Sequence, residues 1–88
     1  MENTASQKPL VLYGTSACHL CEEAHRMLLQ LRRSNPAVAF TERDISESEE
    51  LFQRYGLRIP VVVRPDGEEL GWPFTPTELG VFCSGCER

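Results

Sequence analysis

Short apolar runs alternate with longer segments of helical period along this chain. Strands are predicted over Leu10–Tyr13, Val38–Asp44, Ile59–Val63 and Glu68–Trp72. The first run is apolar throughout, which is typical of a strand covered on both faces, so we expect it at the centre of a sheet. Residues 64–67 form a turn, and Leu70 and Trp72 share one face of the returning strand. The last two strands therefore form a hairpin.

A long amphipathic helix is predicted directly after the first strand. From Cys18 to about Ser34, apolar residues recur at steps of three and four and form one buried stripe, made of Leu20, Ala24, Met27, Leu28 and Leu31. His25 is interpreted as a solvated residue at the edge of this helix. Pro36 follows and cannot continue the helix, so the helix ends before it.

A second helix is predicted from its start and stop signals. Ser46 and Glu49 match a capping box, in which a hydroxyl and a carboxylate three residues later satisfy free amide groups. The apolar face of this helix is expected to consist of Leu51, Phe52 and Tyr55. Gly56 is expected to end it in the left-handed conformation.

The last helix has a similar signal at its start. Thr75 supplies a capping hydroxyl, Pro76 suits the first helical position, and Glu78 completes the box. Its buried stripe is predicted to contain Leu79, Phe82 and Cys83. Gly85 is expected to end the helix.

The resulting order of elements is βαβαββα. The first strand–helix–strand unit should be parallel with a right-handed crossover. The sequence therefore predicts an α/β protein with a central four-stranded mixed sheet flanked by helices. Residues 9–88 are expected to form a single domain, and residues 1–8 a flexible tail.

Composition and charge exclude several classes of partner. The 88 residues are 41% hydrophobic and 25% charged, with a net charge of −4. This charge disfavours nucleic acids and anionic membranes. No apolar run approaches the roughly 20 residues that cross a bilayer, and residues 1–8 lack the apolar centre of a signal peptide. We therefore expect a cytoplasmic monomer.

The chemistry of the chain is concentrated in Cys18-His19-Leu20-Cys21, between the first strand and the first helix. Two thiols at this spacing can close a disulfide ring or face one metal ion. Free amides and the positive end of the helix dipole would stabilise a sulfur anion at Cys18, and a protonated His19 would add to this, while Glu22 and Glu23 oppose it. This position favours redox chemistry, with Cys18 as nucleophile and Cys21 as the resolving thiol.

A second pair, Cys83 and Cys86, lies near the other end of the chain. Its separation from the first pair is much longer than the roughly 15–20 residues of a zinc ribbon, so a metal site shared by both pairs is disfavoured. Cys83 continues the apolar stripe of the last helix, which favours packing over a second redox site.

Two motifs resemble those of the thioredoxin and glutaredoxin families. One is the Cys-x-x-Cys pair after the first strand; the other is Tyr55-Gly56-Leu57-Arg58-Ile59-Pro60-Val61, similar to the segment whose proline is cis in thioredoxins. Residues 70–75 further resemble the small bacterial glutaredoxin-like proteins. The resemblance implies a thioredoxin-like fold, and a cis Ile59–Pro60 bond where the backbone of Ile59 docks an extended substrate.

The chain also departs from the family pattern. Glutaredoxins of this size carry a lysine before the first cysteine and a Gly-Gly pair after the last strand, both used to hold glutathione. Here these places read Gly-Thr-Ser-Ala at 14–17 and Gly-Trp-Pro-Phe at 71–74. We therefore expect weak binding of glutathione. The His19-Leu20 dipeptide differs from those of both families, so neither family's redox potential carries over.

The sequence thus predicts a dithiol–disulfide oxidoreductase that acts in cell redox homeostasis and needs no organic cofactor or metal. Its catalytic residues are Cys18 and Cys21, and the residues expected at the substrate are Tyr13, His19, Ile59, Pro60 and Trp72. The substrate would be a protein or low-molecular-weight disulfide, with glutathione or a reductase as reductant. The alternatives are a zinc or iron–sulfur module using the same cysteines, and a thioredoxin-like interaction module with little turnover.

Overall fold

The computed structural model describes residues 9–16, 18–36 and 38–84. Four strands form one mixed sheet: β1 (Leu10–Gly14), β2 (Phe40–Asp44), β3 (Val61–Val63) and β4 (Glu69–Gly71). Their order is β2-β1-β3-β4, in which β1 is parallel to β2 and antiparallel to β3, while β3 and β4 form a hairpin. The predicted α/β class, mixed sheet and central first strand are therefore confirmed.

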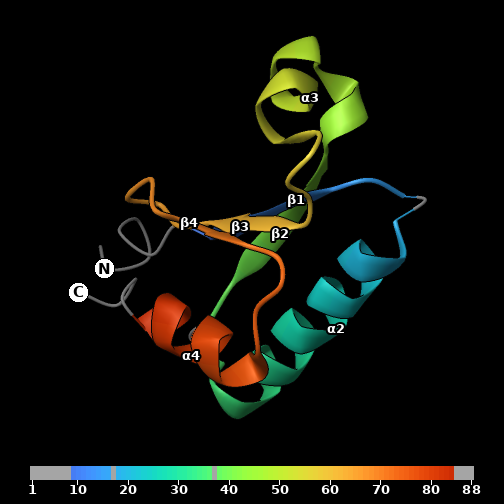
Figure 1. Cartoon of the computed structure of the whole chain (residues 1–88). Coiled ribbons are helices and arrows are strands. Elements are labelled where there is room, and N and C mark those ends of the chain that lie inside the picture. Colours follow the sequence, from blue (N-terminus) through green and yellow to red (C-terminus); the bar gives the residue numbers. More distant parts are fainter. Residues whose placement is uncertain (1–8, 17, 37, 85–88) are drawn as a thin grey trace.

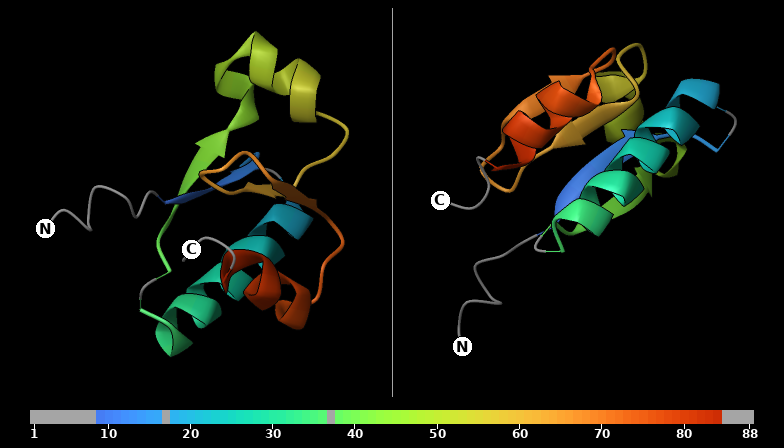
Figure 2. Two further views of the ribbon diagram at one scale, coloured as in Figure 1. Left: turned by 90° about the vertical axis from the view of Figure 1, so that its left-hand side faces the viewer. Right: turned by 90° about the horizontal axis from the view of Figure 1, so that it is seen from below.

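Helices cover both faces of this sheet. Helices α2 (His19–Ser34) and α4 (Pro76–Ser84) lie side by side on one face, whereas α3 (Glu49–Tyr55) lies on the other (Figures 1 and 2). Alternation along the strands divides the apolar side chains in the same way, because successive residues of a strand point to opposite faces. No helix of the described segments is long and apolar enough to span a membrane.

The larger core lies between the sheet and the pair α2 and α4. It is made of Leu10, Leu12, Ala24, Leu28, Val38, Val62, Phe74, Leu79 and Cys83. Ala24 and Leu28 are fully buried, which confirms the predicted stripe on α2, but Leu20 is an exception because it is exposed at the first turn. The burial of Leu79 and Cys83 confirms their predicted packing, with Phe82 partly buried beside them.

The opposite face holds a smaller core of Ile45, Tyr55 and Val61, with partly buried neighbours such as Tyr13 and Leu51. The apolar face predicted for α3 is wrong at Phe52, which is 58% exposed. A helix of 7 residues presents few positions to one face of a sheet, and here Leu51 and Tyr55 occupy them.

The start of α3 also differs from its prediction. Asp44 caps a short 3-10 turn, η1 (Ile45–Glu47), by accepting hydrogen bonds from the amide and the hydroxyl of Ser46. Ser46 is thereby used as a donor, so the predicted capping box with Glu49 does not form. Ser48 caps α3 instead, with its hydroxyl oxygen accepting the amide of Leu51 at 3.3 Å.

Two further helix-end signals had different outcomes. Gly56 is not left-handed, since its φ is −53° and its amide donates to the carbonyl of Phe52 at 2.8 Å. The capping box at the start of α4 is confirmed: Glu78 accepts the amide of Thr75 at 2.9 Å, and Thr75 accepts the amide of Glu78 at 3.0 Å. The predicted tail 1–8, the helix end at Gly85 and the thiol of Cys86 lie outside the described residues.

Candidate functional site

Cys18 occupies the N-cap of α2, directly beyond the loop that leaves β1. Its sulfur accepts a hydrogen bond from the amide of Cys21 at 3.1 Å, so the two cysteines share the first turn of the helix. Cys18 is half-buried and Cys21 is buried, with 7% of its surface exposed. Of the two, Cys18 is therefore the more exposed to an incoming disulfide.

The thiol of Cys21 lies against the end of the central strand. A Cβ atom added at Gly14 would come within 2.6 Å of the Cys21 sulfur, so this position has room for glycine only. Burial, followed by the hydrogen bond and charge of Cys18 and the charge of Glu42, raises the pKa of Cys21 to about 12. A backbone hydrogen bond at Thr15 acts in the opposite direction. Cys21 is thus held as a neutral thiol near neutral pH.

The Ile59–Pro60 segment reaches the same edge of the sheet as the cysteines. Because β1 and β3 are antiparallel, with Tyr13 opposite Val61, the end of β1 meets the start of β3. The Ile59–Pro60 peptide is cis, as the resemblance predicts, and Trp72–Pro73 is cis as well. Pro60 is buried, Ile59 is half-buried, and the carbonyl of Pro60 accepts the amide of Trp72 at 3.1 Å.

The remaining residues expected at the substrate have other partners. The ring of Tyr13 stacks on Tyr55 on the α3 side, with centroids 4.6 Å apart. Trp72 packs against the larger core and meets Phe74 edge-on at 4.9 Å. His19 is exposed and its Nε2 lies 3.3 Å from a carboxylate oxygen of Glu23, which offsets any positive charge that the imidazole would offer Cys18. The structure therefore joins Cys18 and Cys21 directly, whereas Tyr13, Trp72 and His19 contact other residues.

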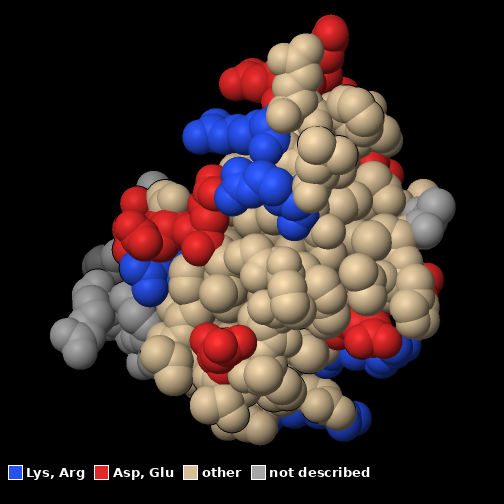
Figure 3. All heavy atoms as spheres, in the orientation of Figure 1, with Lys and Arg blue, Asp and Glu red and all other residues tan. Residues whose placement is uncertain are grey.

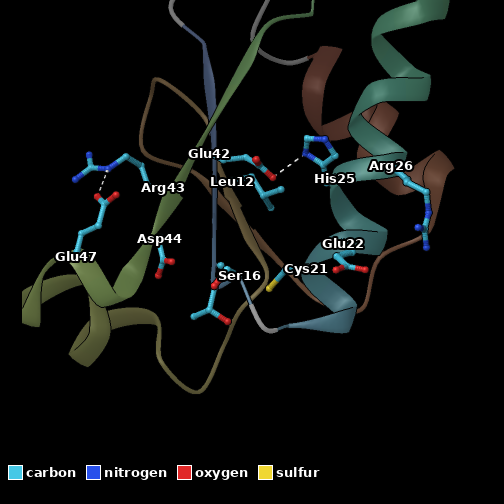
Figure 4. A pocket seen from close by; sticks show the side chains of 12 residues that line it. Leu12, Ser16, Cys21, Glu22, His25, Arg26, Glu42, Arg43, Asp44 and Glu47 are labelled. Atoms are coloured by element: carbon cyan, nitrogen blue, oxygen red, sulfur yellow. Dashed lines mark hydrogen bonds and ion pairs between the residues drawn. The ribbon is translucent and has the colours of Figure 1, made fainter.

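A pocket of about 520 Å³ opens beside Cys21, between α2 and the end of β2. Cys21 lines it from the first turn of α2, with its sulfur directed toward the end of β1, while His25 and Glu42 face each other further along the pocket (Figure 4). Nδ1 of His25 lies 2.7 Å from Oε2 of Glu42. Sequence reasoning missed both residues. The signal in the sequence was that His25 follows Cys21 by one helical turn, whereas the position of Glu42 opposite Leu12 comes from the register of β1 and β2.

The other charged groups at this pocket are held or directed elsewhere. Arg43 pairs with Glu47 at 3.3 Å, and Arg26 points away from the pocket (Figure 4). Hydrogen bonds donated by the amide and hydroxyl of Ser46 hold the pKa of Asp44 below its usual range. The pocket is therefore bordered mainly by carboxylates. Within the described residues, no group of three or more His, Cys, Asp or Glu side chains could hold a metal ion.

Comparison with known proteins places this arrangement in context. The family of glutaredoxin-like domains (DUF836) matches residues 9–81. The crystal structure of the structural-genomics target protein XcR50 from X. campestris is 39% identical with a TM-score of 0.76, covering 86% of this chain and 96% of that one. The solution structure of protein Ne2328 from Nitrosomonas europaea is 28% identical with a TM-score of 0.71, covering 85% and 89%. No curated protein matches the chain. These likenesses confirm the predicted thioredoxin-like fold.

Proposed function

The chain belongs to the family of glutaredoxin-like domains, and on this premise we propose that it is a dithiol–disulfide oxidoreductase. The observation that carries the proposal is the shared first turn of α2, in which the sulfur of Cys18 accepts the amide of Cys21. A thiolate accepts such a hydrogen bond more strongly than a thiol does. The contact therefore favours a nucleophilic sulfur at the more exposed cysteine.

The reaction has two exchange steps. The thiolate of Cys18 attacks one sulfur of the substrate disulfide, forms a mixed disulfide and releases the first substrate thiolate. The sulfur of Cys21, after losing its proton, then attacks Cys18 and releases the second substrate thiolate. The protein is left with a Cys18–Cys21 disulfide, and a reductant such as glutathione or a reductase must restore the two thiols. Such a cycle suits the cytoplasm, where dithiols are kept reduced.

A protein disulfide fits the surroundings of the site better than glutathione does. Leu20, between the cysteines, and Leu57, in the turn before Pro60, are both exposed apolar side chains. The middle of the face shown in Figure 3 is uncharged, whereas acidic side chains gather beside it, over the hairpin that contains β4. In contrast, the pocket beside Cys21 is bordered by Glu22, Glu42 and Asp44, which repel the carboxylates of an anionic peptide. This repulsion is a second reason to expect weak binding of glutathione.

Three cysteine variants test the proposal in a turbidity assay of insulin reduction driven by dithiothreitol. Cys18→Ser should lose activity because no nucleophile remains. Cys21→Ser should accumulate a mixed disulfide at Cys18, visible by intact mass. Cys83→Ala is the matched control, since this buried thiol packs in the larger core and should be dispensable for exchange.

Two results would contradict the proposal. Equal activity of the wild type and Cys18→Ser would leave an interaction module with little turnover. Stoichiometric metal in protein purified under reducing conditions, lost on mutation of Cys18 or Cys21, would favour the metal-binding alternative.

A further inference from the structure

The pair His25–Glu42 has no part in the exchange steps described so far, although it lines the same pocket as the resolving thiol. His25 follows Cys21 by one helical turn and therefore lies on the same side of α2. Glu42 reaches the pocket from β2. Two elements far apart in the sequence thus bring an imidazole and a carboxylate to the pocket that Cys21 also lines (Figure 4).

The hydrogen bond between His25 and Glu42 has a defined donor and acceptor. A carboxylate only accepts hydrogen bonds, so Nδ1 of His25 donates to Glu42, and in the neutral form of the imidazole the lone pair is on Nε2. The ring of Phe40 meets the imidazole edge-on, with centroids 5.7 Å apart, and helps to hold its orientation. The contact with Glu42 thus uses Nδ1 and leaves Nε2 as the nitrogen through which His25 can accept a proton.

We infer that the His25–Glu42 pair accepts the proton of Cys21 through the solvent of the pocket during the second exchange step. This inference rests on the proposed function, because it concerns the resolution of a mixed disulfide at Cys18. It assigns a proton-accepting and positioning role to two residues that do not themselves touch the reacting sulfurs.

The protons and electron pairs of this step are accounted for as follows. The S–H proton of Cys21 passes to Nε2 of His25, and the thiolate of Cys21 attacks the sulfur of Cys18. The bond between Cys18 and the substrate sulfur breaks, and its electron pair leaves with the substrate thiolate. That thiolate takes a proton from solvent, and the imidazolium returns its proton to solvent. The net charge of the pocket is unchanged while the thiolate exists, because the imidazolium balances it.

The neighbouring charged groups are less suited to this role. They are Glu22 and Arg26 on α2, Arg43 and Asp44 on β2, and Glu47 on η1. Asp44 is a weaker base than usual because the hydrogen bonds from Ser46 lower its pKa. Arg43 and Glu47 are paired with each other, and a guanidinium cannot accept a proton. Glu22 remains as the carboxylate to use as a control. Cys21 needs a base because burial, the main cause, raises its pKa to about 12, so that the thiol must lose a proton before it can attack.

The test follows the reaction of reduced protein with dithionitrobenzoate by stopped flow over a range of pH, in a Cys86→Ser background. Attack by Cys18 releases one thionitrobenzoate, and resolution by Cys21 releases a second in a slower phase. The Cys21→Ser variant identifies that second phase by its loss. His25→Gln should slow the second phase about tenfold or more near neutral pH, as removal of a general base does, and leave the first phase unchanged. The difference should vanish at high pH, where hydroxide removes the proton.

Glu42→Gln separates proton transfer from simple electrostatics. The charge of Glu42 opposes a thiolate at Cys21, so its removal would accelerate the second phase if charge alone mattered. We expect slower resolution instead, because His25 loses the carboxylate that supports its imidazolium. Glu22→Gln, which removes one carboxylate from the same pocket but keeps the pair, should leave the second phase within about twofold of the wild type.

Three results would overturn the inference: an unchanged second phase in His25→Gln, an acceleration in Glu42→Gln, or equal slowing of both phases in either variant. If the wild type itself shows no second phase, the proposed oxidoreductase function fails, and the role of the pair fails with it. A normal second phase in both His25→Gln and Glu42→Gln would leave the proposed function intact and contradict only the role of the pair.

Discussion

The two faces of the sheet differ in how much apolar surface they bury and in the chemistry that they carry. The face under α2 and α4 holds the larger core, the thiol of Cys21 and the pocket. The face under α3 holds a small core around Tyr55, while α3 itself exposes Phe52 and the turn after it exposes Leu57. The comparison indicates that the face with the larger core contributes more to stability, whereas the other face leaves apolar side chains exposed that a partner could contact.

The largest expected effect tests the difference in burial. Leu28 on α2 is fully buried, so Leu28→Ala should lower the free energy of unfolding by about 2–5 kcal/mol. Leu51→Ala makes the same change on α3, where the side chain is only partly buried, and should cost less than about 2 kcal/mol. Urea unfolding of both variants measures the two values. Equal losses would mean that the faces contribute alike to stability.

The second prediction concerns the close approach of β1 and Cys21. Gly14→Ala should displace the Cys21 sulfur, because the added Cβ would lie 2.6 Å from it, and should cost about 1–3 kcal/mol. Resolution of the mixed disulfide should slow at the same time. Gly80→Ala is the matched control: its Cβ would be 3.9 Å from Leu31, an ordinary contact, and alanine in a helix should stabilise α4 by up to about 1 kcal/mol. If Gly14→Ala keeps full stability and a normal rate of resolution, the packing argument is wrong.

The smallest expected effect is a dependence of stability on pH from the α3 side. The guanidinium of Arg58 pairs with Glu69, with Tyr55 donating its hydroxyl at 3.2 Å, and these contacts hold the pKa of Glu69 below its usual range. A lowered pKa in the folded state stabilises the fold above the pKa of an unfolded glutamate, about 4.3. This stabilisation is lost as the pH falls through the folded-state value.

Glu69→Gln removes that titration. Between about pH 7 and about pH 3, the wild type should therefore lose more stability than the variant does, as measured by the shift of the urea midpoint. Glu68→Gln, at the neighbouring exposed position, should behave like the wild type. Parallel loss in wild type and Glu69→Gln would show that the pair with Arg58 does not couple stability to pH.

Local patterns predicted most elements of the fold because they depend on near neighbours in the chain. The apolar run 10–13 became the central part of β1, and the Thr75–Glu78 capping box formed at the start of α4. Errors arose where two local signals competed. Asp44 accepts the amide of Ser46 in place of the predicted capping box. Gly56 continues the helical conformation instead of adopting the left-handed one.

What the sequence alone determined is the Cys18–Cys21 pair at a strand-to-helix junction, since spacing and context are properties of adjacent residues. What only the tertiary structure decided is the surroundings of those thiols. The parallel pairing of β1 with β2 brings Glu42 to His25, and the antiparallel pairing with β3 brings Pro60 to the end of β1. Such contacts depend on strand register and helix placement, which arise from burial of the whole core and leave no trace in the local pattern.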